Sequence, residues 1–355
     1  MASKWVKGAF GVVGVVVVVA GGGFAWGTSA TKATLAVVHE THRVDLPMPW
    51  PLFDEEVATL RAERAAASAP ADSVLAAVSG VSADAAEPVA DPLAGVDLDA
   101  IARERGVARG KHLIEARFAC VECHGQNLAG GTMIDDPAIG RLLGPNLTTG
   151  EGSRTAAYTM ADWDRTVRHG VKPDGTAAVM PAEDFVSMSD QELVDVVTYI
   201  RAQPAVDATV PAPTFGPVGT MLVATGKMVL AADRLKDHQR AHAALPPATE
   251  ANVEFGSHMA QICTGCHRTD LSGGPITAGD PAWPPARNLT PHEQGLKGWT
   301  YEQFLATLRE GKRPDGTLLK APMSLMAPYA KNMTDTELQA LWAYLQSLPG
   351  KSTGA

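Results

Sequence analysis

Two five-residue strings of the sequence share one pattern of cysteine and histidine. They read Cys120-Val121-Glu122-Cys123-His124 and Cys263-Thr264-Gly265-Cys266-His267, and together they contain all four cysteines of the chain. Two thiols three positions apart can form thioethers with the two vinyl groups of one porphyrin, and the next residue then offers its imidazole to the iron. The pattern predicts two covalently bound haem c groups, with His124 and His267 as the proximal iron ligands.

Paired cysteines have two other common uses. Two Cys-X-X-Cys pairs can close a four-thiolate zinc site, and a single pair can act as a redox dithiol. Neither use gives a role to the histidine that follows the second cysteine of each string. Commitment of all four cysteines to haem leaves none for a disulfide, so cysteine usage does not indicate the compartment.

Length and charge restrict the organisation and the partners. The chain has 355 residues, of which 45% are hydrophobic, and this length favours two domains. Its formal net charge is -9. Nucleic acid is excluded as the expected partner, because phosphate binding requires a basic surface.

The N-terminus carries an apolar run over residues 8–27, preceded by Lys4 and Lys7. About 20 such residues cross a hydrocarbon core of ~30 Å, and the positive flank favours a cytoplasmic N-terminus. We therefore expect residues 1–30 to anchor the protein in the bacterial inner membrane, with the haem domains facing the periplasm. The alternative is a cleaved signal peptide ending near Thr28-Ser29-Ala30, although the apolar region of such peptides is usually only about 7 to 15 residues long.

Residues 31–98 predict a low-complexity tether. From residue 65 to residue 97 the chain is mostly Ala, Ser, Val, Asp and Pro without aromatic residues. Such a composition cannot bury enough apolar surface to offset the entropy of ordering. Only residues 55–64 have the pattern of a short helix within it.

An internal duplication with a period of roughly 143 residues extends beyond the cysteine strings. Asn146-Leu147-Thr148 recurs as Asn288-Leu289-Thr290, and Pro173-Asp174-Gly175 recurs as Pro314-Asp315-Gly316. Each copy is therefore expected to form one domain, over residues 99–205 and 250–350. The connector, residues 206–249, contains short apolar stretches that predict a helix packed between the domains.

Both copies end in the pattern of the same helix. Ser189 with Glu192 and Thr334 with Glu337 form capping boxes, each followed by apolar residues at helical spacing. These residues are Leu193, Val196, Val197 and Ile200 in the first copy and Leu338, Leu341, Trp342 and Leu345 in the second. A second helix should precede each haem string, where Gly110 or Gly256 would let the terminal helix approach with Tyr199 or Tyr344.

Each copy resembles a class I cytochrome c domain, and the pair resembles the membrane-anchored dihaem cytochromes c of bacteria. The resemblance implies an all-α fold, with two tandem class I domains behind an N-terminal transmembrane helix and a disordered tether. In this family the sixth iron ligand is a methionine between the Asp-Gly turn and the terminal helix. The resemblance thus implies Met180 for the first haem and Met323 for the second; Met326 is the alternative, and Met323 keeps the period of the cysteines.

In the family, a backbone carbonyl of a Gly-Pro-Asn-Leu loop accepts the other N–H of the proximal imidazole. Residues 144–147 match this pattern, whereas residues 286–289 read Ala-Arg-Asn-Leu. His169 lies nearest to the ligand segment among the other histidines. Its counterpart in the second copy is Glu310, so a shared architecture argues against His169 as an iron ligand.

The implied function is electron transfer without catalysis. Two irons held by His and Met have no open position, so the protein is expected to relay electrons between a dehydrogenase or quinol-oxidising complex and a terminal acceptor. It would do so as a free carrier or as a subunit of a respiratory complex. The alternative is a dihaem peroxidase-type enzyme, in which Met323 and Met326 both point away and leave the second haem open.

Overall fold

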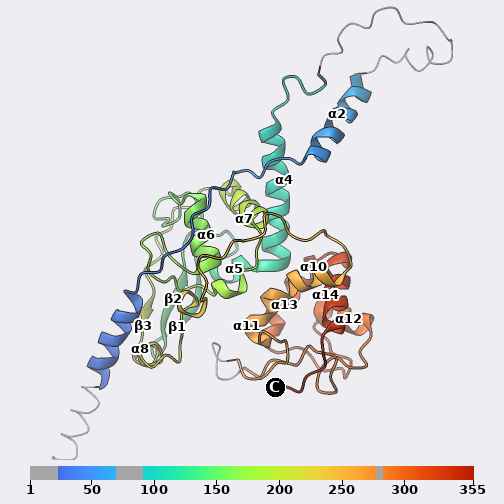
Figure 1. Cartoon of the computed structure of the whole chain (residues 1–355). Coiled ribbons are helices and arrows are strands. Elements are labelled where there is room, and N and C mark those ends of the chain that lie inside the picture. Colours follow the sequence, from blue (N-terminus) through green and yellow to red (C-terminus); the bar gives the residue numbers. More distant parts are fainter. Residues whose placement is uncertain (1–22, 69–90, 277–282) are drawn as a thin grey trace, which may run out of the picture.

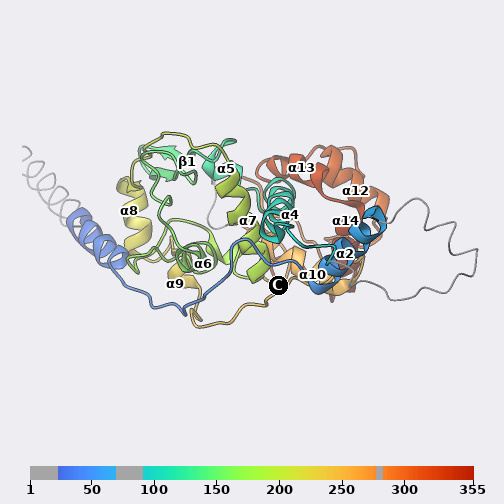
Figure 2. The ribbon, with the colours of Figure 1, turned by 90° about the horizontal axis from the view of Figure 1, so that it is seen from above.

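The computed structural model describes residues 23–68, 91–276 and 283–355. Two helical units, one for each copy of the repeat, lie side by side (Figure 1, Figure 2). The first unit and its flanking segments contain α2 (Asp54–Ser68), α4 (Leu98–His112), the π-helix η1 (Leu113–Phe118), α5 (Cys120–His124), α6 (Met160–His169), the 3-10 helix η2 (Ala182–Asp184), α7 (Asp190–Ala202), α8 (Pro217–Ala224) and α9 (Ala231–Arg234). The second contains α10 (Val253–Met259), the 3-10 helix η3 (Ala260–Cys263), α11 (Thr264–His267), α12 (Tyr301–Glu310), α13 (Met323–Asn332) and α14 (Asp335–Ser347).

In each unit the helix before the haem string crosses the terminal helix at a glycine. A Cβ atom at Gly110 of α4 would lie 2.0 Å from the carbonyl oxygen of Asp195 and 2.8 Å from the Cβ of Tyr199. At Gly256 of α10 the corresponding distances are 2.0 Å to the Ala340 oxygen and 2.8 Å to the Tyr344 Cβ. The predicted crossing of glycine and tyrosine is thus confirmed in both units, with the same closeness of approach.

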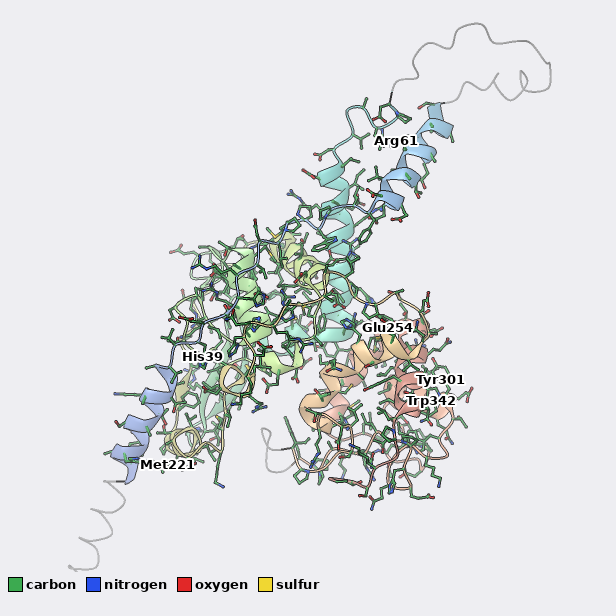
Figure 3. All side chains as sticks on the ribbon, in the orientation of Figure 1. His39, Arg61, Met221, Glu254, Tyr301 and Trp342 are labelled. Atoms are coloured by element: carbon green, nitrogen blue, oxygen red, sulfur yellow. The ribbon has the colours of Figure 1, made fainter. Side chains whose placement is uncertain are left out.

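The terminal helices begin at the predicted capping boxes. The Ser189 hydroxyl accepts from the Glu192 amide, and the Glu192 carboxylate accepts from the Ser189 amide; Thr334 and Glu337 do the same. The apolar stripes point inward. The first core gathers around Ile114, Trp163, Val167, Leu193, Val197 and Ile200, and the second around Leu271, Leu296, Phe304, Leu341 and Leu345 with Tyr301 and Trp342 against them (Figure 3).

The repeated Asp-Gly positions are turns in both units. Gly175 has φ +83° and Gly316 has φ +80°, a region that favours glycine. An isolated antiparallel bridge flanks each turn, Val171 with Ala177 and Lys312 with Leu318. Each turn leads the chain into its predicted methionine segment.

The two units differ just before their haem strings. Ten positions separate Gly110 from Cys120, but only seven separate Gly256 from Cys263. The first unit accommodates its additional residues in the π-helix η1, whereas the second uses the tighter η3. The three additional residues of the first unit are thus taken up between the helix crossing and the cysteine string. Both strings therefore follow an equivalent crossing.

The predicted all-α fold is wrong. Strands β1 (Gly131–Asp136), β2 (Gly140–Gly144) and β3 (Thr214–Phe215) form an antiparallel sheet in the order β1-β2-β3. Gly131 pairs with Gly144 and Asp136 with Gly140, so the chain after the first haem string folds into a hairpin, to which the connector adds β3. The pairing of β2 with β3 joins residues 140–141 to residues 214–215, segments far apart in the sequence, and local periodicity does not reveal it.

The predicted transmembrane helix is also corrected. Residues 1–22 of the expected anchor lie outside the described residues, and in the described part of the chain no helix is both long and apolar enough to cross a membrane. Residues 23–35 are helical but contain Lys32, and Thr31 is buried with its hydroxyl donating to the Thr220 carbonyl at 2.8 Å. The placement at the bacterial inner membrane, which depended on the anchor, is overturned with it.

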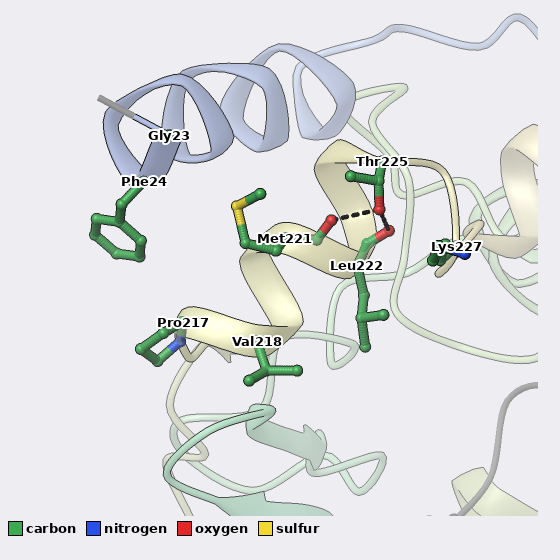
Figure 4. A pocket seen from close by; sticks show the side chains of 8 residues that line it. All are labelled: Gly23, Phe24, Pro217, Val218, Met221, Leu222, Thr225 and Lys227. Carbon is green, nitrogen blue, oxygen red and sulfur yellow. Dashed lines mark hydrogen bonds between the residues drawn. The ribbon is translucent and has the colours of Figure 1, made fainter. Parts of the chain in front are cut away.

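The connector helix α8 packs against residues 23–35 and not between the two units. Met221 lies over Gly27, where a Cβ atom would be 2.5 Å from its sulfur, and Phe24, Val218 and Leu222 border an open apolar hollow beside it (Figure 4). A Cβ atom at Gly219 would lie 1.9 Å from the Ile139 oxygen. The connector thus covers the outer, sheet-bearing end of the first unit (Figure 2).

Part of the expected tether lies along the first unit. We call residues 36–53 the strap. The His39 amide donates to the Gly175 carbonyl at 2.8 Å, and the His42 amide donates to the His238 carbonyl at 3.0 Å. The strap then leads into α2, where Glu56 pairs with Arg105 at 2.5 Å. Backbone pairing of this kind requires no apolar side chains, so composition did not indicate it.

The glycine crossing makes a testable prediction. Gly110→Ala should lower the free energy of unfolding by about 1–3 kcal/mol, because the added methyl group overlaps the backbone of Asp195. Chemical denaturation of the mature protein measures the change. Lys111→Ala is the matched control, since its side chain is 57% exposed; equal stability of the two variants would contradict the close crossing.

Candidate functional site

The first cysteine string forms the short helix α5, which Ala119 precedes in a left-handed conformation with φ 49°. The His124 Nδ1 atom lies 2.9 Å from the carbonyl oxygen of Pro145. A carbonyl only accepts, so Nδ1 carries the proton and Nε2 keeps its lone pair. A metal-ligating histidine needs this arrangement, in which one nitrogen is oriented and the other is free to bind.

The second string repeats the arrangement. The His267 Nδ1 atom donates to the Arg287 carbonyl at 2.7 Å. The second loop has Ala286-Arg287 where the first has Gly144-Pro145. The hydrogen bond to the proximal histidine is kept, because every residue type has a backbone carbonyl. Burial lowers the pKa of both histidines, although the hydrogen bonds to the carbonyls oppose this, which favours neutral imidazoles with an available lone pair.

The loop that supplies each carbonyl is fixed by the recurrent asparagine. Asn146 donates to the Val206 carbonyl at 2.8 Å, and Asn288 donates to the Lys351 carbonyl at 2.7 Å. In the first unit the β-hairpin packs closely against the cysteine string, since a Cβ atom at Gly144 would lie 2.0 Å from the backbone oxygen of Cys123. Asn146 and Gly144 in the first unit, and Asn288 in the second, form a cradle that holds each string and its histidine in place.

The cysteine thiols are unsuited to act as thiolates. Burial raises the pKa of Cys120 to about 12, with the neighbouring Cys123 adding to it. Burial raises the pKa of Cys263 to about 12 as well, with Asp184 adding to it. Dithiol exchange requires the thiolate, whereas a thioether carries no charge. The donor set therefore fits covalent haem attachment better than dithiol exchange, and a four-thiolate zinc site would leave the two oriented imidazoles without a role.

Met180 lies in the first unit's core region. Together with Cys120 and Val121, it packs against the buried cluster that contains Phe118 and Phe185. The structure thus brings the predicted methionine and the first cysteine string to one apolar cluster. Its role as an iron ligand stays a prediction.

The two candidate methionines of the second unit lie on one helix. Met323 is the first residue of α13 and Met326 follows within the next turn, and both are half-buried. The first unit has only the three-residue η2 in the corresponding segment. The choice of Met323 over Met326 therefore stays a prediction.

Each methionine segment touches the cysteine string of the other unit. The Tyr329 hydroxyl of α13 donates to the Glu122 carboxylate of the first string at 2.5 Å. In return, a Cβ atom at Gly265 of the second string would lie 2.3 Å from Asp184 Oδ1 of η2. Burial, with the nearby Glu183, raises the pKa of Asp184 to about 7. Both strings therefore lie at the face that the units share.

Two histidine–glutamate pairs join the same face reciprocally. His112 Nε2 of the first unit lies 2.9 and 3.0 Å from the Glu337 carboxylate oxygens, and His258 Nε2 of the second lies 2.9 and 3.0 Å from those of Glu192. Sequence reasoning gave these histidines no role. The signal in the sequence was that each histidine lies two positions after its crossing glycine. The structure shows that each one contacts the capping-box glutamate of the other unit.

Arg117 strengthens one of these pairs. Its guanidinium donates to Glu192 at 2.8 Å and lies 5.9 Å from the ring centroid of Phe255 in the other unit. Burial raises the pKa of Glu192, but the hydrogen bond from His258 and the charge of Arg117 outweigh it and lower the pKa to about 2.

Comparison with known families identifies both units. Residues 254–349 match the family described as cytochrome c, and residues 105–200 match cytochrome c oxidase, cbb3-type, subunit III. The chain therefore contains two cytochrome c domains, the kind of domain that binds haem c covalently.

Relatives with established functions are cytochrome subunits of dehydrogenases. The chain is 27% identical to the cytochrome c subunit of a quinone alcohol dehydrogenase of Gluconacetobacter polyoxogenes, over 65% of this chain and 53% of the relative. It is 26% identical to the gluconate 2-dehydrogenase cytochrome c subunit of Pantoea cypripedii, over 69% and 60%. It is 23% identical to the fructose dehydrogenase cytochrome subunit of Gluconobacter japonicus, over 71% and 54%. The chain spans little more than half the length of these relatives.

The shared face predicts an acid-sensitive stability. The folded-state pKa of Glu192 lies below its ordinary value of 4.5, so its contribution is complete above pH 4.5 and disappears as the pH falls towards 2. Glu192→Gln, which preserves the capping box, should lower the free energy of unfolding by about 3 kcal/mol at pH 7. Denaturation curves between pH 7 and pH 3 should show this difference shrinking.

The control is Glu293→Gln, whose carboxylate pairs with Lys297 at the surface and should not change stability noticeably. A difference between the wild type and Glu192→Gln that is constant over the whole pH range would rule out the charged pair as its source.

Proposed function

We propose that the chain is a dihaem electron-transfer subunit that relays electrons from a dehydrogenase to a downstream redox protein. One observation carries the proposal: both cysteine strings have an imidazole oriented by a backbone carbonyl, and both lie at the face shared by the two units. A binding module without redox function would not need two such strings in contact with the opposite unit.

The proposal keeps the site residues expected from the sequence. Cys120 and Cys123 hold the first haem c, with His124 and Met180 on its iron, and Cys263 and Cys266 hold the second, with His267 and Met323 on its iron. The domains extend over residues 99–205 and 250–350. The cradle glycines and the two oriented imidazoles support this assignment.

Haem c, when bound, supplies a one-electron iron couple, and a methionine ligand raises its reduction potential. The chain's own residues set the surroundings of that couple. The carbonyls of Pro145 and Arg287 fix the two imidazole planes, and the apolar cluster around Phe118 and Phe185 packs against Met180. A buried environment with fixed ligands reorganises little when charge changes, which favours rapid electron transfer.

The dehydrogenase partner is inferred from the relatives. All three relatives described above carry the name of a dehydrogenase cytochrome subunit. They support a role for this chain as an electron acceptor from a dehydrogenase. The chain matches only part of each relative, so the substrate of that dehydrogenase and the terminal acceptor are not assigned.

Methionine substitutions test the iron ligands. Met180→Ala and Met323→Ala should each remove the methionine-to-iron charge-transfer band from one haem and lower the reduction potential of that haem, since methionine ligation raises it. Absorbance spectra and a redox titration of purified, matured protein measure both effects. Met188→Leu is the control, because Met188 is a buried core residue. If Met326→Ala removes the second band and Met323→Ala does not, Met326 is the ligand.

Peroxide and carbon monoxide separate a carrier from an enzyme. The wild-type protein should contain two haems per chain by pyridine haemochrome analysis, should keep its spectrum when either ligand is added, and should show no peroxidase turnover. A high-spin second haem that binds peroxide would instead establish the peroxidase-type alternative.

A further inference from the structure

Three imidazoles and one carboxylate from three separate segments meet outside the haem-binding strings. His42 belongs to the strap, Asp164 and His169 to α6, and His242 to the connector, and one ligand atom from each lies within 4.8 Å of all the others. We call these four residues the histidine cluster. His169 and Asp164 are fully buried, and buried polar side chains require partners to be stable.

Hydrogen bonds around the cluster determine which nitrogens carry protons. His238 Nε2 lies 2.8 Å from the Ala232 carbonyl and so donates, which leaves its Nδ1 as an acceptor. His169 Nδ1 lies 3.4 Å from that atom and therefore carries the proton. The Nε2 atom of His169 is left with a free lone pair that faces the cluster.

The same reasoning applies to His42. Its Nδ1 atom lies 3.3 Å from the His238 carbonyl, which only accepts, so Nδ1 carries a proton and Nε2 is the ring nitrogen directed at the cluster. That Nε2 atom faces Asp164 Oδ2 at 3.7 Å. Within the described residues, Asp164 Oδ2 is buried and has no hydrogen-bond partner. Outer hydrogen bonds that fix the tautomer in this way are typical of metal-ligating histidines.

The remaining oxygen of Asp164 neutralises a neighbouring cation. Arg168 Nε donates to Asp164 Oδ1 at 2.7 Å, and Arg168 Nη1 donates to Asp190 at 2.8 Å. Two carboxylates therefore share one guanidinium, and Asp164 is held with Oδ2 directed at the imidazoles. The ion pair with Arg168 orients the Asp164 carboxylate through Oδ1 and leaves its Oδ2 atom without a hydrogen bond within the described residues.

The distances suit a small tetrahedral cation. His169 Nε2 and His242 Nε2 lie 3.3 Å apart, close to the separation of about 3.3 Å between two ligands at ~2.0 Å from a tetrahedral zinc ion. The 3.7 Å between His42 and Asp164 is slightly longer, and side-chain movements of about 1 Å would complete the shell. Burial, with the charges of the neighbouring histidines and arginines, lowers the pKa of His169 and of His242 to about 3, so both are neutral donors at physiological pH.

We propose that His42, Asp164, His169 and His242 bind one zinc ion, which fastens the strap and the connector to α6 of the first unit. Three imidazoles and a carboxylate form a donor set that zinc accepts readily. In the metal-free chain, a proton on His242 Nε2 can bridge to His169 Nε2, and zinc takes the place of that bridge. The site is independent of the haems and of the electron-transfer proposal.

The test uses untagged, full-length protein that has been matured with haem. After dialysis against EDTA, the protein receives one equivalent of ZnCl2 and is desalted, and zinc and iron are counted by mass spectrometry of the elements. We expect about one retained zinc per chain and a zinc-dependent rise in Tm, because zinc binds the folded state. X-ray absorption should show nitrogen and oxygen neighbours at about 2.0–2.1 Å.

His42→Ala and His242→Ala should each weaken zinc binding at least about tenfold and abolish the rise in Tm. His292→Ala, which alters a histidine outside the cluster, should keep both. Haem content and circular dichroism verify that each variant folds, and His42 lies on the strap, so its loss leaves the haem-bearing units intact. Zinc retention unchanged in both variants, no zinc retained by the wild type, or sulfur neighbours at about 2.3 Å would overturn the proposal.

Discussion

Two buried carboxylates connect local and global structure in this protein. Glu192 and Glu337 each complete the cap of their own terminal helix. Each also accepts a hydrogen bond from a histidine of the opposite unit. A charge in a region of low dielectric is stable only while its partners stay in place. The start of each terminal helix, the crossing with the helix before the haem string, and the docking of the units therefore depend on one another.

Structural features that depend on a few neighbouring residues could be predicted from the sequence. The capping boxes, the Asp-Gly turns and the crossing of Gly110 with Tyr199 follow from local rules for helix starts, positive φ and close approach, and the structure confirms them. The β-sheet and the π-helix η1 were not predicted. The hairpin of β1 and β2 pairs neighbouring segments, but β3 joins it from the connector and η1 packs against α13 of the other unit. Hydrophobic periodicity indicates neither contact.

The sites show the same division. The carbonyl partner of His124 was expected from a four-residue pattern, and the bond from His267 to Arg287 survives because it needs only backbone. The choice between Met323 and Met326 stays open, since both fall on a helix that the first unit lacks. The histidine cluster escaped sequence reasoning because its members come from the strap, α6 and the connector, and no spacing relates them.

The reciprocal face relates the two units in an approximately two-fold manner. Each unit carries both halves of the contact, a histidine two positions after the crossing glycine and a capping-box glutamate, so a single unit could pair with a second copy of itself through a two-fold axis. Because one chain carries both units, each half of the contact is held at a high effective concentration near the other. Within the described residues, the π-helix η1 and the hairpin of the first unit depart from a two-fold relation between the units.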